Sequence, residues 1–227
     1  MRVEPYAVGS YLHIVKRGAR GMAITSDVSD QFRFLRLLYF MNDQFFNEDW
    51  ELQVEGKHFG YRPDTWPERE PLVSILSYTL MPNHFHLLIK EIQEGGVSAF
   101  MQKLGQSMTV HFNLKYDQRG SIFQGSYRSR TISNDTYLQY VVAYISVKNT
   151  FELYPHGGLK GAMDDFEKAW KWAMTYPFSS LGTYAQNSID PLVDLAACNE
   201  VIQAPKEFKV FAKDVILGGK WTEGEFE

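Results

Sequence analysis

A pair of histidines two residues apart is the feature of this sequence with the clearest chemical potential. His84 and His86 flank Phe85 inside an apolar run that is typical of a β-strand. Alternate strand residues point to the same side, so both imidazoles project together while Phe85 faces the opposite, core side. Two neutral imidazoles on one face supply half of a metal site. The same pair is also compatible with solvated histidines or with hydrogen bonds to backbone carbonyls.

The spacing of the histidines excludes several other sites. A histidine-triad hydrolase needs a third alternate histidine, and Leu88 stands at that position. The helical zincin motif needs a glutamate after the first histidine and a histidine four residues along, and neither is present. Two-histidine phosphoesterases need a second His-x-Ser/Thr motif, which none of the other four histidines supplies. A divalent metal would therefore be completed by an oxygen or amide ligand from elsewhere.

Tyrosines recur along a helix that we expect to begin near Asn134 or Asp135, both good N-caps, and to run to about Lys148. Tyr137, Tyr140 and Tyr144 follow one another at intervals of three and four residues, so they share roughly one side of this helix. Their spacing alone is equally typical of amphipathic tyrosines at the border of a core.

Several segments, in order along the chain, resemble the single-tyrosine HUH transposases, in particular the REP-associated tyrosine transposases. The run Met81-Pro82-Asn83-His84-Phe85-His86, within residues 78–89, resembles the metal-binding strand of that family. The resemblance spans most of residues 8–184. Its other segments are 11–18, 112–129, 135–145 and 176–180.

The resemblance implies an enzyme that cleaves and rejoins single-stranded or hairpin DNA through a 5′-phosphotyrosine. His84 and His86 then bind a divalent cation, Mg²⁺ or Mn²⁺, which polarises the scissile phosphate as a Lewis acid. Tyr144, followed by Ile145 as in the similar motif, is the implied nucleophile. Because the phosphotyrosyl link keeps the bond energy, the same site can rejoin DNA without ATP.

The end of the tyrosine helix departs from the family pattern. Members usually carry Tyr-Ile-x-x-Asn-Pro, and this asparagine, four residues after the tyrosine, can complete the metal shell. Here Lys148 occupies that position and Asn149 follows it. Either Asn149 reaches the metal from the helix end, or water or DNA completes the shell. Lys148 is a candidate to contact the phosphate and to favour the tyrosinate, since a free tyrosine has a pKa of about 10.

The elements that must position these residues predict an α+β fold. Alternation predicts a strand over 8–16 and two strands, or one bent strand, over 72–80 and 84–91, while 121–130 is a short strand or a loop. Helical spacing predicts helices beginning at 26 or 27, near 97 and near 134 or 135. In the first helix we expect Phe32 on the buried face. The order of elements favours a ferredoxin-like antiparallel sheet with helices on one face, plus a C-terminal helical extension.

The formal net charge is −4, but the charges are unevenly distributed. Residues 1–42 hold six basic and three acidic residues, and residues 97–148 hold six and two. Residues 43–70 hold three and eight, and residues 161–227 six and eleven. A local basic face can bind phosphates even on an acidic protein. The candidates for DNA contact in the two basic segments are Lys16, Arg17, Arg20, Lys103, Lys115, Arg128 and Arg130.

Composition and length support a packed core. The chain has 227 residues, 44% hydrophobic and 15% aromatic, which argues against wholesale disorder. We expect a catalytic domain over 1–155, with an acidic insertion at 43–70, and a helical extension over 156–227 packed on it. No apolar run reaches the roughly 18 residues of a membrane span. The single cysteine and the absence of an apolar N-terminal segment predict a cytoplasmic protein, as a monomer or homodimer.

Three functions from different classes follow. The first is catalytic DNA cleavage and rejoining, as in DNA transposition and recombination. The second is a non-catalytic, domesticated DNA-hairpin-binding protein of the same fold, which the altered helix end and low net charge favour. The third is an unrelated metal-dependent phosphoesterase, for which Tyr144 would be unimportant. Only the first produces a DNA adduct linked to tyrosine.

Overall fold

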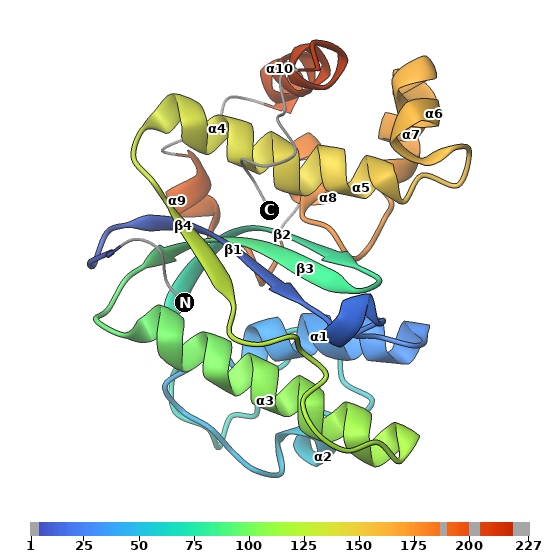
Figure 1. The fold of residues 1–227 in the computed structure, drawn as a ribbon. Helices are drawn as coiled ribbons and strands as arrows, with labels where there is room; N and C mark the ends of the chain where they lie inside the picture. Colours follow the sequence, from blue (N-terminus) through green and yellow to red (C-terminus); the bar gives the residue numbers. More distant parts are fainter. Residues whose placement is uncertain (1–4, 187–189, 200–204, 220–227) are drawn as a thin grey trace.

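A four-stranded antiparallel sheet in the order β2-β3-β1-β4 lies at the centre of the molecule (Figure 1). The computed structural model describes residues 5–186, 190–199 and 205–219. The strands are β1 Tyr11–Arg17, β2 Val73–Met81, β3 His84–Glu91 and β4 Arg128–Ile132.

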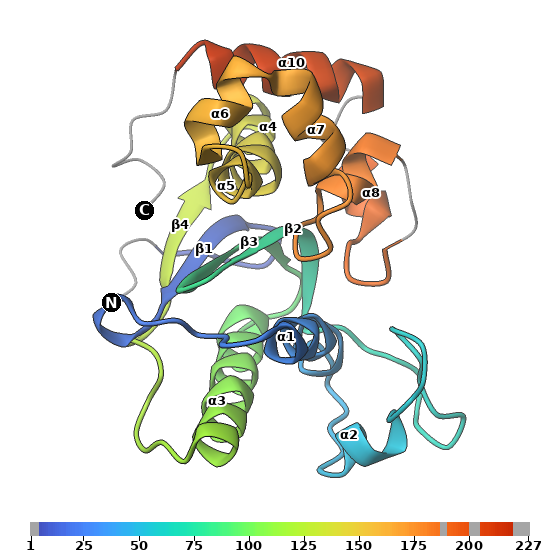
Figure 2. The same ribbon diagram turned by 90° about the vertical axis from the view of Figure 1, so that its right-hand side faces the viewer.

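Helices α1 (Val28–Phe40) and α3 (Gly96–Tyr116) cover one face of this sheet (Figures 1 and 2). Helix α1 joins β1 to β2, and α3 joins β3 to β4. The strand-helix-strand-strand-helix-strand order and the strand order together confirm the predicted α+β, ferredoxin-like sheet. Two short elements lie in the connections: the 3₁₀ turn η1 Ala19–Gly21 and α2 Trp50–Gln53, which belongs to the acidic insertion.

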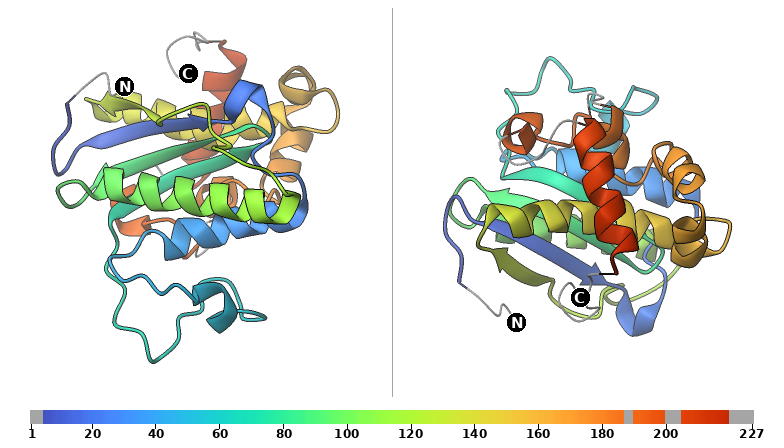
Figure 3. Two further views of the ribbon diagram at one scale, coloured as in Figure 1. Left: turned by 60° about the horizontal axis from the view of Figure 1, so that its bottom comes forward. Right: turned by 90° about the horizontal axis from the view of Figure 1, so that it is seen from above.

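The chain after β4 covers the opposite face (Figure 2). The tyrosine-bearing helix lies there, and not beside α1 and α3, because β2 and β3 are buried on both faces and both need a cover. Seen from above in Figure 3 (right), α10 crosses α4, and the rings of Tyr140 and Phe211 are 5.3 Å apart. The elements are α4 Asp135–Ala143, η2 Tyr144–Lys148, α5 Asn149–Glu152, α6 Gly158–Asp164, α7 Phe166–Ala173, α8 Leu181–Gln186, α9 Leu195–Asn199 and α10 Pro205–Leu217.

The outer edge of β2 is closed by a turn from the C-terminal part of the chain. The Leu80 amide donates to the Phe178 carbonyl (2.9 Å), and the Ser180 amide donates to the Tyr78 carbonyl (3.0 Å). Backbone pairing of this kind satisfies groups that an open edge strand would expose. The division into two domains at residue 155 stays a prediction, although the sheet and the C-terminal part are joined here.

Helix α1 begins where the sequence predicts, but one residue expected on its buried face is exposed. The Asp27 carboxylate accepts a hydrogen bond from the Asp30 amide (3.0 Å), as an N-cap does. The expected burial of Phe32 is wrong, since this side chain is 50% exposed. Its ring lies 5.1 Å from that of Phe178, at the rim of the core. The other residues that the helical spacing places on the same face, Leu35, Leu38 and Tyr39, are buried, and Phe34 is buried with them.

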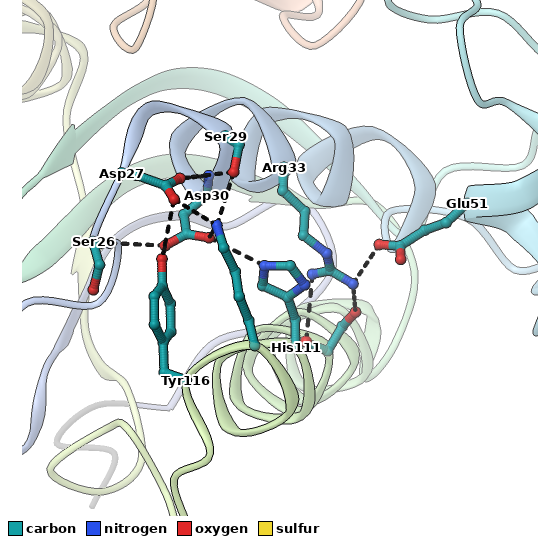
Figure 4. A network of polar contacts seen from close by, with 10 residues as sticks. Ser26, Asp27, Ser29, Asp30, Arg33, Glu51, His111 and Tyr116 are labelled. Atoms are coloured by element: carbon teal, nitrogen blue, oxygen red, sulfur yellow. Dashed lines mark hydrogen bonds and ion pairs between the residues drawn. The ribbon is translucent and has the colours of Figure 1, made fainter.

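A polar network ties the start of α1 to the C-terminal half of α3 (Figure 4). The buried Asp30 carboxylate accepts hydrogen bonds from Lys115 (2.7 Å), Tyr116 (2.7 Å), His111 (3.1 Å) and the Ser26 amide (2.8 Å). Burial alone would raise the pKa of Asp30, but these hydrogen bonds, led by the one from Lys115, outweigh burial and lower the pKa to about 2. The ionised carboxylate therefore stabilises the packing of α1 on α3.

We predict that Asp30→Asn lowers the free energy of unfolding at neutral pH by about 1–3 kcal/mol, because the network loses its charged acceptor. The folded-state pKa lies below the usual value of about 3.9, so this contribution is complete above that pH. It is lost as the pH falls toward 2. Urea unfolding at several pH values measures both effects. The exposed Asp164→Asn is the control, and an equal loss in both variants would contradict the role of Asp30.

Candidate active site

His84 and His86 lie on the face of β3 that the α4–α5 segment covers, and Phe85 points to the other face. Their ring centroids are 4.9 Å apart, and both side chains are buried. Phe85 packs in the α1–α3 layer, with its ring 5.1 Å from that of Phe34. The alternation predicted from the sequence is therefore present, and two imidazoles converge on one side of the sheet.

A third imidazole, which the sequence analysis did not select, completes this cluster. His13 Nε2 is 2.9 Å from His86 Nδ1, and the two rings stack with centroids 5.1 Å apart. Burial, followed by the charge of Arg130, lowers the pKa of His13 to about 3, so His13 is neutral. The register explains the contact, because β1 lies beside β3 with Val15 opposite His86. Strand alternation places His13 on one face of β1, but only the strand order brings that face to His86.

The electrostatic environment keeps His86 uncharged. Burial is the main cause that lowers its pKa well below the usual value, and the nearby His13, His84, Lys148 and Arg17 add to it. A neutral imidazole is the form that binds a metal, whereas a protonated one is a cation that repels it. The environment of His86 thus suits a metal ligand.

Tyr144 faces the histidines from the covering layer. Its ring centroid is 5.8 Å from that of His86 and 5.9 Å from that of His13, in edge-on arrangements. The two neighbouring tyrosines of the helix lie elsewhere. Tyr140 packs against Phe211, and Tyr137 lies under the Arg130 guanidinium at 5.4 Å. Tyr144 and the histidines therefore come together from segments far apart in the sequence.

The helix changes its hydrogen-bond pattern where Tyr144 lies. Residues 144–148 form a π-helix, in which the Asn149 amide donates to the Tyr144 carbonyl five residues back. In an α-helix the residue four positions along would occupy the next turn, so one extra residue is accommodated here. Single π-turns of this kind are frequently found at functional sites. Lys148 and Asn149, where the sequence departs from the family's Tyr-Ile-x-x-Asn-Pro pattern, lie at the end of this π-turn.

Side chains outside the helix satisfy carbonyls around this turn. The Thr79 hydroxyl, from β2, donates to the Ile145 carbonyl. The Ser146 carbonyl accepts from the Thr150 hydroxyl (2.8 Å) and from the Ser179 hydroxyl (3.1 Å). Because Thr79 lies opposite His86 in the β2–β3 register, the sheet and the turn are linked beside the histidines.

Lys148 and Asn149 are both buried, with different surroundings. The Lys148 ammonium lies 4.8 Å from the centre of the Tyr144 ring and forms an ion pair with Glu152 (2.5 Å). The Asn149 side-chain nitrogen is buried and has no hydrogen-bond partner among the described residues. An amide exchanges its oxygen and nitrogen by a rotation about one bond, so Asn149 carries an unused polar atom suited to a ligand.

The residues present fit a divalent cation if the ligand set includes groups other than histidine and carboxylate. Within the part of the chain that the structure describes, no group of three or more His, Cys, Asp and Glu residues could hold a metal. The Nδ1 atoms of both histidines are engaged, by His13 and by the Asn83 side chain (2.6 Å), so coordination would take place at Nε2. Such outer partners orient metal-binding imidazoles. Asn149, water or a DNA phosphate remains to complete the shell.

The seven predicted DNA-contacting cations fall into separate groups. Arg17, Arg128 and Arg130 lie on the histidine face, since they stand opposite His84, Val15 and His13 in the sheet register. Lys16 stands opposite Phe85 and so faces the α3 layer. Lys103 and Lys115 lie on α3, on the opposite side of the sheet, and Arg20 is exposed in the η1 turn that follows β1.

Part of the chain is similar to a known protein family. Residues 68–148 match the family model described as "Transposase IS200 like". This part of the chain is thus similar to IS200-like transposases, and we refer to it below as the IS200-like segment. The IS200-like segment contains both histidines of β3, Tyr144 and Lys148, and ends just before Asn149. The resemblance predicted from the sequence is thereby confirmed over this part of the chain.

A solved structure described as a REP-associated tyrosine transposase bound to a REP hairpin is similar at 15% identity. The similarity has a TM-score of 0.47 and covers 85% of this chain and 89% of the other. A search of curated proteins found no match. Among the described residues, no helix is long and apolar enough to cross a membrane.

We predict that Thr79→Val lowers the free energy of unfolding by about 1–3 kcal/mol, because the buried Ile145 carbonyl loses its hydroxyl donor. Exchange of the Asn149 amide proton should become faster as the π-turn loosens. Urea unfolding and hydrogen exchange measure the two effects. The control is Thr25→Val, since the buried Thr25 hydroxyl has no hydrogen-bond partner among the described residues. Equal behaviour of the two variants would remove Thr79 as a support of the turn.

Proposed function

We propose that this protein cleaves and rejoins single-stranded or hairpin DNA through a covalent link to Tyr144. The observation that carries the proposal is the contact of Tyr144 with His86, inside a segment that matches IS200-like transposases, and with His13 on the neighbouring strand. The confirmed family match supports transposase-type DNA processing. The nucleophile, the metal and the substrate are the proposed parts.

In the proposed reaction the Tyr144 hydroxyl oxygen attacks the phosphorus of a phosphodiester. A bond forms between this oxygen and phosphorus, and the bond from phosphorus to the 3′-oxygen breaks. The phenolic proton is released, and the departing oxygen takes up a proton to become a 3′-hydroxyl. The products are a 5′-phosphotyrosine and a free 3′-end. Attack by a 3′-hydroxyl on the phosphotyrosine reverses these bond changes and rejoins DNA.

The remaining site residues would bind and orient the reactants. A divalent metal held by His84 and His86, Mg²⁺ or Mn²⁺, would supply Lewis acidity at the scissile phosphate. Asn149 is the proposed third protein ligand. Lys148, whose ammonium lies over the Tyr144 ring, would stabilise the negative charge that develops on the attacking oxygen.

Electrostatics favour DNA on the same face. Arg17, Arg128 and Arg130 lie on the histidine side of the sheet, and Arg128 and Arg130 are exposed on the edge strand β4. We propose these arginines as phosphate contacts, which would make binding weaken with added salt. A cytoplasmic location and a monomer or homodimer remain predictions from the sequence.

The burial of the site sets a condition on catalysis. Tyr144 and His86 are each 1% exposed, so a phosphodiester reaches the hydroxyl only when part of the covering layer moves. The same burial favours the second candidate function, a domesticated protein that binds DNA hairpins and does not cut them. The third candidate, a phosphoesterase without a tyrosine nucleophile, receives no support from the Tyr144–His86 contact.

We predict that Tyr144→Phe abolishes DNA cleavage and the covalent adduct but leaves folding and DNA binding intact, because it removes one oxygen and keeps the ring. The test incubates protein, Mn²⁺ and a pool of DNA hairpins with randomised single-stranded flanks. Mass spectrometry of the digested adduct then locates the linked residue. The matched variant Tyr140→Phe should retain the adduct.

Two outcomes would contradict the proposal in different ways. An adduct on Tyr140, or an active Tyr144→Phe protein, would show that the nucleophile is misassigned. Hairpin binding without any adduct, in the presence of metal, would favour the domesticated binder.

A further inference from the structure

Two cavities flank helix α3 on the side of the sheet away from Tyr144. The view in Figure 3 (left) brings α3 forward, with α1 beside it. A cavity of about 650 Å³ lies between α3, α1 and the acidic insertion. A second, of about 270 Å³, lies between α3 and the end of β1. Gln106 and Val110 line both cavities, so the two are neighbours across the exposed ridge of α3.

The lining combines apolar surfaces with neutral hydrogen-bonding groups, and in the larger cavity also with charged side chains. Phe46 and Trp50 contribute aromatic rings to the larger cavity, and Phe123 contributes one to the smaller. Val110 is 51% exposed on the ridge. Gln106 supplies an amide to both cavities, and Thr109 a hydroxyl to the smaller. Aromatic faces with amide and hydroxyl groups suit flat heteroaromatic rings with polar edges, which are the features of nucleobases.

Each cavity has a lysine that forms no direct ion pair with a carboxylate among the described residues, although the Asp43 carboxylate acts on Lys103 from nearby. Lys16 donates to the Gly125 carbonyl (3.2 Å), with its ammonium 4.7 Å from the centre of the Phe123 ring. Lys103 donates to the Asp43 carbonyl (2.7 Å). Each ammonium carries three donors, so both can also bind phosphate. Lys115, by contrast, is held by Asp27 and Asp30, which makes it the weaker candidate.

The acidic side chains of the larger cavity favour a base over a phosphate in its interior. Glu48 and Glu51 line this cavity, and Glu51 is paired with Arg33 (2.5 Å). Carboxylates repel phosphate but accept hydrogen bonds from the amino groups of bases, as they do from cytosine N4. A base would therefore lie near the carboxylates of the larger cavity, and a backbone phosphate would lie at Lys103.

Gly105 keeps the smaller cavity open beside Lys16. A Cβ atom at Gly105 would lie 3.1 Å from Lys16 Cε and 3.9 Å from the Phe123 ring. A larger residue would therefore fill the space between helix and lysine. Burial lowers the pKa of the Lys16 ammonium, and a phosphate beside it would counter that effect.

We propose that this face of α3 binds unpaired nucleotides of the DNA substrate, with bases in the two cavities and backbone phosphates at Lys16 and Lys103. The inference rests on the proposed function for its ligand class, but it concerns a surface separate from the Tyr144 site. Nucleotides flanking a hairpin would be held on one side of the sheet while cleavage takes place on the other.

Fluorescence anisotropy with two DNA probes tests this inference. One probe is a hairpin with randomised single-stranded tails on both sides, and the other is the same hairpin without tails. A stacked base is expected to add roughly fivefold to hundredfold in affinity, so the tailed probe should bind the wild-type protein more tightly by at least that lower factor. Val110→Glu, which places a carboxylate on the ridge between the cavities, should abolish the gain and leave binding of the tailless hairpin unchanged.

The control is Val210→Glu, because Val210 is 61% exposed on α10, in the other layer. It should keep the full gain from the tails. Lys16→Gln and Lys103→Gln should each flatten the salt dependence of the tailed probe alone, by a log–log slope of about 0.7.

The outcomes separate this inference from the proposed function. Failure of both probes to bind at any salt concentration would reject the proposed DNA function, and this inference with it. Hairpin binding that does not depend on the tails, or a gain that survives Val110→Glu, would overturn the inference alone. The cavities would then serve another class of ligand.

Discussion

The hydrogen bond from the Asn149 amide to the Tyr144 carbonyl sets the arrangement on which the candidate site depends. It spans five residues, so the helix takes up one extra residue between the tyrosine and the next turn. Lys148 can then lie along the Tyr144 ring while Asn149 occupies the following buried position. The extra residue lies at the point where Lys148 and Asn149 depart from the family pattern described in the sequence analysis.

The sheet holds this turn in place and supplies the other half of the site. Thr79 links β2 to the Ile145 carbonyl, and its register neighbour His86 faces Tyr144. His13 orients His86 from β1. The opposite face of the same strands packs on α1 and α3, where the Asp30 network fixes the two helices together. Because of strand alternation, the candidate site residues of the sheet lie on one face, and the residues that pack against α1 and α3 lie on the other.

Local patterns in the sequence predict much of this arrangement. The alternation around Phe85 places His84 and His86 on one face, the Asn134 cap marks the start of the tyrosine helix with a bond from the Tyr137 amide (2.8 Å), and the order of elements predicts the sheet. Each of these signals depends on residues that are close together in the sequence. Element order and local propensity therefore suffice for them.

Features that depend on distant partners are not visible in the sequence. Carbonyls of the π-turn accept hydrogen bonds from the Thr79 and Ser179 hydroxyls, which lie in other segments of the chain. The contact of His13 with His86 depends on strand order. The exposed Phe32 ring contacts Phe178, which lies almost 150 residues further along the chain, so local spacing does not reveal this contact. The separation of Lys16 from Arg17 is different, because it follows from local alternation along β1, which sends the two side chains to opposite faces.

The central claim is that the π-turn brings Asn149, together with His84 and His86, to one metal beside Tyr144. A crystal structure of the protein with Mn²⁺, measured at the manganese absorption edge, tests this directly. The account predicts an anomalous peak within coordination distance of Nε2 of both histidines, with the Asn149 side-chain oxygen turned toward it. A peak elsewhere, or one at the histidines with Asn149 turned away, would contradict it.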